Sequence, residues 1–209
     1  MKRDELIRAL ADHAAASAEE EASLEAMRRF VAGPSDPFAR SNPEGHVTGS
    51  AIVARSDGSA FLIVYHRKLG RWLQPGGHTE ESDASVFDTA MREVREETGI
   101  AELSAPLGRE ILDVDVHPIP AHGRDPAHSH FDVRFLLTTE RDVNRLAAED
   151  PLRPMRWRSL EEALAEGVDG SLARSLRKAR EVLGGDGSNS SPLPPSGGEG
   201  QGEGGHQPS

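Results

Sequence analysis

Residues 83–98 are the segment with the clearest structural consequence, because they predict a helix with two chemically different faces. Apolar side chains recur there at helical spacing, and Gly99 follows at a position where glycine commonly ends a helix. The apolar stripe consists of Phe87, Ala90, Met91, Val94 and Thr98. A helix with one such stripe buries it against another layer of the fold. We therefore expect this helix to pack on a sheet.

The second face of the same predicted helix is acidic. Glu93, Glu96 and Glu97 lie within about one turn of each other, where exposed like charges destabilise a helix by a few tenths of a kcal/mol. One explanation is a solvated charged face on which arginines pair with the glutamates. The other is a bound cation, and oxygen ligands alone favour Mg²⁺ or Mn²⁺.

Composition excludes several classes of function. The formal net charge of −11 and the pI of about 5.3 argue against a broad nucleic-acid surface or a surface for anionic membranes. The absence of cysteine excludes disulfides, thiolate metal sites and cysteine nucleophiles. The first residues turn acidic too early for a signal peptide, and no apolar run approaches the roughly 20 residues of a membrane span. We therefore expect a cytoplasmic protein without a membrane segment.

Three regions are predicted along the chain. Residues 1–45 form an N-terminal helical extension, in which one or two helices cover residues 3–32. Residues 46–183 form the main domain. Residues 184–209 are rich in Gly, Ser and Pro, and we expect this tail to be disordered because it cannot bury enough apolar surface.

The main domain mixes strands with helices, which indicates an α/β sandwich whose strand pairing is not readable from the sequence. A hairpin is predicted from VTGSAIVAR and AFLIVYHRK, with a turn at Asp57–Gly58. Residues 69–77 look like a loop. Further strands are expected at 107–117, 130–139 and within 155–160, and helices at 159–166 and 171–183, with a polar loop at 118–129.

The segment around the acidic helix resembles the Nudix box, the signature G-x5-E-x7-R-E-U-x-E-E-x-G-U, in which U is aliphatic. Counting from Gly77, the first half departs from the signature: Asp83 replaces its glutamate, and one residue is inserted before Arg92. Asp83 is a candidate N-cap of the helix, and its part in the signature stays open. The second half matches at Arg92, Glu93, Val94, Glu96, Glu97, Gly99 and Ile100.

This resemblance, which covers roughly residues 46–183, implies both a fold and an activity. The fold is the Nudix-type α/β/α sandwich with a mixed sheet. The activity is hydrolysis of a nucleoside diphosphate linked to another moiety, with Mg²⁺ or Mn²⁺ as cofactor. In the family, the arginine orients the glutamates, which bind metal and help to activate water. The resemblance therefore implies that Arg92, Glu93 and Glu97 are catalytic residues. It also implies that Glu93, Glu96 and Glu97 are metal ligands.

Four histidines lie in and beside the loop at 118–129: His117, His122, His128 and His130. If a strand covers 128–136, His128, His130, Asp132 and Arg134 share one face. The histidines have three interpretations: contacts to substrate, a second metal site with imidazole ligands, or ordinary loop and strand residues. We expect Arg71, His128 and His130 to bind substrate. Because the isomerase branch of the family uses a catalytic cysteine, its activity is not expected here.

Two further hypotheses compete with the hydrolase. The irregular first half of the box favours a catalytically weak Nudix-fold module that binds or senses a nucleotide. A charged helix in an interaction protein would need neither metal nor substrate. The expected partner of the enzyme is a small-molecule nucleoside diphosphate derivative. A homodimer is left open, since many family members dimerise.

Overall fold

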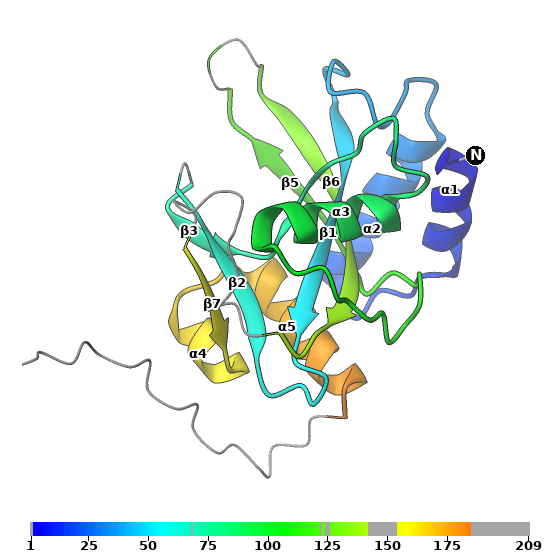
Figure 1. Ribbon diagram of the computed structural model, residues 1–209. Helices are drawn as coiled ribbons and strands as arrows, with labels where there is room; N and C mark the ends of the chain where they lie inside the picture. Colours follow the sequence, from blue (N-terminus) through cyan, green and yellow to red (C-terminus); the bar gives the residue numbers. More distant parts are fainter. Residues whose placement is uncertain (1, 68, 122, 124–125, 142–153, 185–209) are drawn as a thin grey trace, which may run out of the picture.

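A curved mixed sheet with helices on both sides forms the folded part of the protein (Figure 1). The computed structural model describes residues 2–67, 69–121, 123, 126–141 and 154–184. In that part of the chain, no helix is long and apolar enough to span a membrane. The helices are α1 (Lys2–Asp12), α2 (Ala18–Ala32), α3 (Val86–Thr98), α4 (Leu160–Ala165) and α5 (Gly170–Val182); the strands are β1 (Gly45–Ala54), β2 (Phe61–His66), β3 (Arg71–Leu73), β4 (Gly76–His78), β5 (Asp113–Ile119), β6 (His128–Thr138) and β7 (Met155–Arg158).

The seven strands form one sheet with the order β3-β2-β1-β6-β5, while β4 pairs with β1 and β7 pairs with β2. The predicted hairpin is present, since β1 and β2 pair antiparallel around a turn at Gly58, whose φ is 69°. β1 and β6 pair in parallel over ten residues, whereas all other pairs are antiparallel. The sheet is therefore mixed, as the resemblance implies.

Alternation along β1 separates two apolar cores. Val47, Ala51 and Val53 pack in the core that contains the apolar stripe of α3, whereas Ile52 and Ala54 pack in a second core with α4 and α5. Side chains of a strand point alternately to its two faces, so these cores lie on opposite sides of the sheet. The α/β/α arrangement is thereby confirmed.

The two N-terminal helices pack on the α3 side of the sheet. Leu6 and Leu10 of α1 and Leu24 and Met27 of α2 are buried in the same core as α3. In addition, the ring of Phe30 stacks on a phenylalanine of β6 with the ring centroids 3.8 Å apart. The helical extension is therefore an integral part of the packed structure. The division into three regions stays a prediction, and the predicted disorder of the tail falls outside the described residues, which end at 184.

Several predicted boundaries differ from the structure. The strand expected at 107–117 begins only at Asp113, because residues 106–109 form a turn in which Gly108 has a φ of 60°. β6 begins at His128, so the polar loop is shorter than 118–129. Residues 69–77, expected as a loop, contain β3 and the first two residues of β4. Strands of three residues leave too few alternating positions for a pattern to reveal them.

Candidate active site on β4 and α3

Helix α3 begins at Val86, three residues after Asp83, so the candidate N-cap Asp83 does not cap it. Ser85 is the N-cap, and its hydroxyl accepts a hydrogen bond from the backbone N–H of Asp88 at 3.1 Å. Asp83 instead binds the side chain of Arg92: its two carboxylate oxygens accept hydrogen bonds from Nε and Nη2 at 3.0 Å each. Burial raises the pKa of Asp83, but these and other hydrogen bonds outweigh it and hold the pKa below its ordinary value.

Arg92 is the centre of a group of acidic side chains that we call the Arg92 cluster. Its Nη1 donates hydrogen bonds to Glu93 and Glu96 at 3.0 Å each, and its Nη2 donates to the carbonyl of His78 in β4 at 2.8 Å. The Arg92 cluster consists of Arg92, Glu80, Asp83, Glu93 and Glu96. One positive charge thus faces four negative charges. The imbalance favours a further cation.

Strand β4 lies directly against two of the box glutamates. A Cβ atom on Gly77 would lie 2.5–2.6 Å from the carboxylate atoms of Glu93, so only glycine leaves room for that carboxylate. The backbone N–H of Gly76 donates to Oε2 of Glu97 at 3.2 Å. Burial raises the pKa of Glu93 above its ordinary value although Arg92 opposes the shift. Gly76 and Gly77, the glycine pair of β4, therefore lie directly against Glu93 and Glu97. We call the place where the box glutamates meet this pair the acidic site.

The donor set of this site fits a hard divalent cation. Glu93, Glu96 and Glu97 offer only oxygen ligands, which Mg²⁺ and Mn²⁺ prefer, and Gly77 leaves space for one of these carboxylates. Glu93 and Glu96 are at the same time engaged by one guanidinium. Three histidines form a different group. Within the described part of the chain, their ring nitrogens are the ligand atoms that already lie close enough together to hold a metal ion.

Those histidines come from three neighbouring strands. His46 of β1 is in register with His130 of β6 in the parallel pair, and His78 of β4 lies beside them. The ring centroid of His46 is 4.8 Å from that of His78 and 4.8 Å from that of His130. We call His46, His78 and His130 the histidine cluster. His128 lies at its edge, with its ring centroid 5.0 Å from that of His46.

Burial lowers the pKa of each member of the histidine cluster. The pKa falls to about 4 for His46 and His78 and to about 3 for His130, because an imidazolium loses its hydration inside the protein. The rings are therefore neutral at pH 7. The sequence did not single out His46 and His78, whose convergence with β6 depends on the pairing of β1 with β4 and β6. His122 lies outside the described residues.

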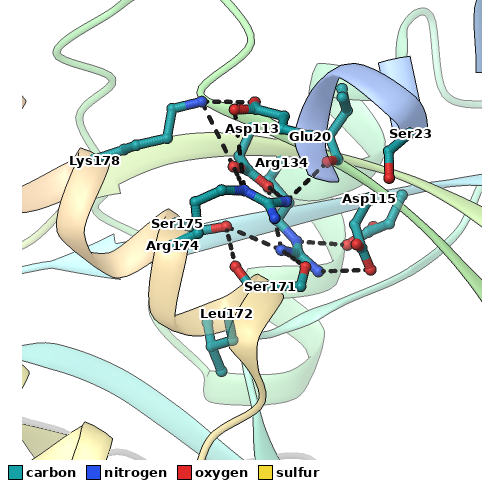
Figure 2. Close-up of polar contacts among 12 residues, drawn as sticks. Glu20, Ser23, Asp113, Asp115, Arg134, Ser171, Leu172, Arg174, Ser175 and Lys178 are labelled. Atoms are coloured by element: carbon teal, nitrogen blue, oxygen red, sulfur yellow. Dashed lines mark hydrogen bonds and ion pairs between the residues drawn. The ribbon is translucent and has the colours of Figure 1, made fainter. Parts of the chain in front are cut away.

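Asp132 and Arg134 share a face of β6 with His128 and His130, as predicted, but both are buried in an ionic network. Figure 2 shows Arg134 in this network beside side chains of α5. Arg134 is 3% exposed and donates hydrogen bonds to Asp132 and Asp113 at 3.0 and 3.3 Å. Asp132 also accepts from the hydroxyls of Thr48 and Ser50 of β1. The Arg134 network consists of Arg134, Asp113, Asp115, Asp132, Arg174, Lys178 and Glu20.

Arg71, a predicted substrate ligand, lies in β3 at the edge of the sheet. Its guanidinium is half-exposed and forms an ion pair of 3.4 Å with Asp169, the N-cap of α5. The structure thus brings Arg71 to α5, while the box glutamates gather at β4. A contact between Arg71 and substrate stays a prediction.

Residues 45–179 match the NUDIX domain family, and no curated protein sequence matches the chain. Among solved structures, the Ap4A hydrolase of C. elegans shares 20% identity over 66% of this chain and 97% of its own, with a TM-score of 0.47. A MutT NUDIX hydrolase from Burkholderia pseudomallei shares 20% over 64% and 97%, with a TM-score of 0.48. The dihydroneopterin triphosphate pyrophosphohydrolase of E. coli shares 18% over 63% and 92%, with a TM-score of 0.46.

Proposed function

Because the chain belongs to the NUDIX domain family, we propose that it is a hydrolase that uses Mg²⁺ or Mn²⁺ to cleave a pyrophosphate bond in a nucleoside diphosphate linked to another moiety. The observation that carries the proposal is the meeting of Glu93 and Glu97 with the glycine pair of β4, beside an arginine that four carboxylates surround. This excess of negative charge would repel a diphosphate unless cations bind first. Metal binding would therefore be a condition for substrate binding.

Glu93, Glu96 and Glu97 would hold the metal. When bound, the metal would neutralise the diphosphate and make water more acidic. Glu93 is the best candidate for a general base, because its carboxylate is mostly buried and its raised pKa lies closer to neutrality. Arg92 would position the carboxylates, since it binds Glu93 and Glu96 through one nitrogen and β4 through another.

Asp83 would act on the site through Arg92. Its carboxylate is almost completely buried and holds two nitrogens of that guanidinium. An aspartate at this place can therefore fix the arginine although the first half of the box departs from the signature. For the substrate itself, we propose contacts with Arg71 and His128. His130 packs against His46, and we propose no substrate contact for it.

The direct test is hydrolysis of a substrate panel by the full chain with Mg²⁺, with Mn²⁺ and with a chelator. The panel comprises ADP-ribose, NDP-sugars, dinucleotides and nucleoside triphosphates. We expect turnover of at least one compound that requires the metal and is lost in the Glu96→Gln, Glu97→Gln double variant. Undiminished activity of that variant would reject the mechanism. A rise in melting temperature with a nucleotide, without turnover under either metal, would instead favour the binding module.

A further inference from the structure

The histidine cluster lies within one residue of the acidic site but faces the other way. In β4, Gly77 abuts Glu93 of α3, whereas the next residue, His78, is paired with Thr48 and joins His46 and His130. Side chains of adjacent strand residues point to opposite faces. The cluster is therefore a group of ligands separate from the box glutamates, and none of its members is a specified position of the Nudix box.

His46 has an unusual environment. Its side chain is 3% exposed, and neither of its ring nitrogens has a hydrogen-bond partner among the described residues. Leaving a buried donor or acceptor unpaired costs about 1–3 kcal/mol, and native proteins rarely retain such a group without a reason. The rings of His78, His128 and His130 lie beside it, with centroids 4.8, 5.0 and 4.8 Å from its own. A neutral imidazole has one nitrogen that can accept a hydrogen bond, but none of these rings forms a hydrogen bond with His46.

A bound cation would give the unpaired ring nitrogens of His46 a partner. One ring nitrogen from each of His46, His78 and His130 can be chosen so that all three lie within 4.8 Å of one another. A neutral imidazole nitrogen is a ligand for borderline transition metals, whereas Mg²⁺ takes oxygen ligands. Three histidines with one open position are a known arrangement for zinc. With metal–nitrogen distances of about 2.0–2.1 Å, the ligand atoms in a tetrahedral site lie roughly 3.4 Å apart, so the rings need only a small approach.

The geometry points to a second metal site, in which His46, His78 and His130 bind one divalent transition-metal ion of the Zn²⁺ or Co²⁺ class. His117 supports this assignment from the neighbouring strand. It is in register with His130, and its Nδ1 lies 3.0 Å from a carboxylate oxygen of Asp115. A carboxylate on one ring nitrogen orients the other nitrogen for a metal, so His117 is a candidate for the fourth position.

A metal ion on the histidine cluster would connect three strands, and one of these strands also forms part of the acidic site. His46, His78 and His130 come from β1, β4 and β6, and β4 has only three residues, of which the first two meet Glu97 and Glu93. A metal ion on His78 would therefore hold β4 from the face opposite the glutamates. Binding of the transition metal itself does not depend on the proposed hydrolase activity.

The test is binding of Co²⁺ to the untagged full chain after removal of metals with a chelator. Calorimetry measures the stoichiometry and affinity, and visible absorption reports the ligand field, which differs between nitrogen-rich tetrahedral and all-oxygen octahedral sites. With Mg²⁺ in excess to occupy the acidic site, we expect one Co²⁺ per chain with a tetrahedral spectrum, and we expect Zn²⁺ to displace this ion. No binding, or an octahedral spectrum that excess Mg²⁺ abolishes, would overturn the proposal.

Variants locate the site. His78→Gln and His130→Gln change partly exposed ligands, and each should weaken Co²⁺ binding by more than the roughly 10–100-fold cost of losing an outer-shell partner. His66→Gln, outside the cluster in β2, should retain wild-type affinity. Circular dichroism and thermal unfolding verify that each variant is folded. Unchanged affinity in folded His78→Gln and His130→Gln would also reject the site.

The double variant Glu93→Gln, Glu97→Gln separates this inference from the proposed hydrolase. It should retain Co²⁺ on the histidines although it loses any turnover that depends on Mg²⁺. If it instead loses Co²⁺ binding while the histidine variants retain it, the ion occupies the acidic site and the histidine site is rejected. A chain that binds Co²⁺ through the histidines but hydrolyses nothing would reject only the hydrolase.

Discussion

The Arg92 cluster and the Arg134 network both consist of an arginine surrounded by carboxylates, but the ratio of positive to negative charges differs between them. In the Arg92 cluster, one guanidinium faces four carboxylates. In the Arg134 network, three cations face four carboxylates, and hydroxyls of Thr48 and Ser50 satisfy part of the remainder. The network thus has one carboxylate more than it has cations, whereas the cluster has three carboxylates more than its one guanidinium.

Burial separates the two groups further. Arg134 is 3% exposed and Asp113 is fully buried, so an unbalanced charge there would destabilise the fold. The side chain of Glu96 is 45% exposed, and that of Arg92 is 19% exposed, which leaves the cluster accessible to ions. We therefore propose that the ionic network on the α5 side serves stability and that the chemistry takes place where β4 meets α3. The following predictions test that division.

The largest expected effect is on stability, from Arg134→Met. Removing one partner of a buried ion pair costs about 3–5 kcal/mol, because the remaining carboxylates stay buried without compensation. Urea denaturation measures the change. The control is Arg141→Met, which breaks an exposed pair with Glu102 and should cost less than about 1 kcal/mol. Equal costs for the two variants would contradict the structural role of the Arg134 network.

Glu93→Gln should affect activity rather than stability. We expect a loss of roughly 10²–10⁴-fold in kcat for the best substrate of the panel, the range typical of a general base. The unfolding free energy should change by less than about 1 kcal/mol, because the amide keeps the shape of the side chain. Glu81→Gln, at an exposed position before the helix, is the matched control. A Glu93→Gln enzyme with wild-type kcat would remove Glu93 from the mechanism.

Gly77→Ala tests whether the glycine pair serves the acidic site. The added methyl group would lie 2.5–2.6 Å from the carboxylate atoms of Glu93, so this side chain must move. A displacement of about 1 Å in a catalytic group can lower the rate about 10²-fold. Steady-state kinetics measure the loss. Gly170→Ala, where a Cβ meets nothing within 4 Å, should be neutral; an active Gly77→Ala variant would show that Glu93 tolerates displacement.

The smallest effect concerns pH and Glu20, which belongs to the Arg134 network. Burial raises its pKa, but hydrogen bonds from His13, Lys178 and the N–H of Ala16 outweigh this and lower the pKa from 4.5 to about 2. Its charge therefore stabilises the fold fully above pH 4.5, and this contribution is lost as the pH falls towards 2.

Urea denaturation at pH 7, 4.5 and 3 measures this contribution. Glu20→Gln should be less stable than the wild type at pH 7, and the difference should shrink as the pH falls below 4.5. A difference that stays constant with pH would mean that the carboxylate of Glu20 is not stabilised in its charged form.

The acidic helix and the order of elements could be predicted from the sequence because they depend on local patterns. Seven signature positions fall within nine residues from Arg92 to Ile100, and the apolar stripe of α3 repeats at helical spacing. The position of Asp83 could not be predicted in the same way. An aspartate near a helix start favours capping, but only the tertiary structure reveals that Ser85 caps and Asp83 binds Arg92.

The histidine cluster depends on long-range pairing, which local patterns do not contain. His46 and His130 are 84 residues apart in the chain and meet because β1 and β6 pair in parallel. His78 joins them because three residues of β4 pair with β1. A shift of one residue in either register would turn the side chains to the other face.

Mn²⁺ binding followed by electron paramagnetic resonance tests whether the box glutamates hold a hard divalent cation. The measurement compares the wild type with the Glu93→Gln, Glu97→Gln variant in the presence of a non-hydrolysable diphosphate analogue and with the histidine cluster saturated by Zn²⁺. Saturable Mn²⁺ binding by the wild type, lost in the variant, is the predicted result. Equal Mn²⁺ binding by the two proteins would show that Glu93 and Glu97 do not hold the ion.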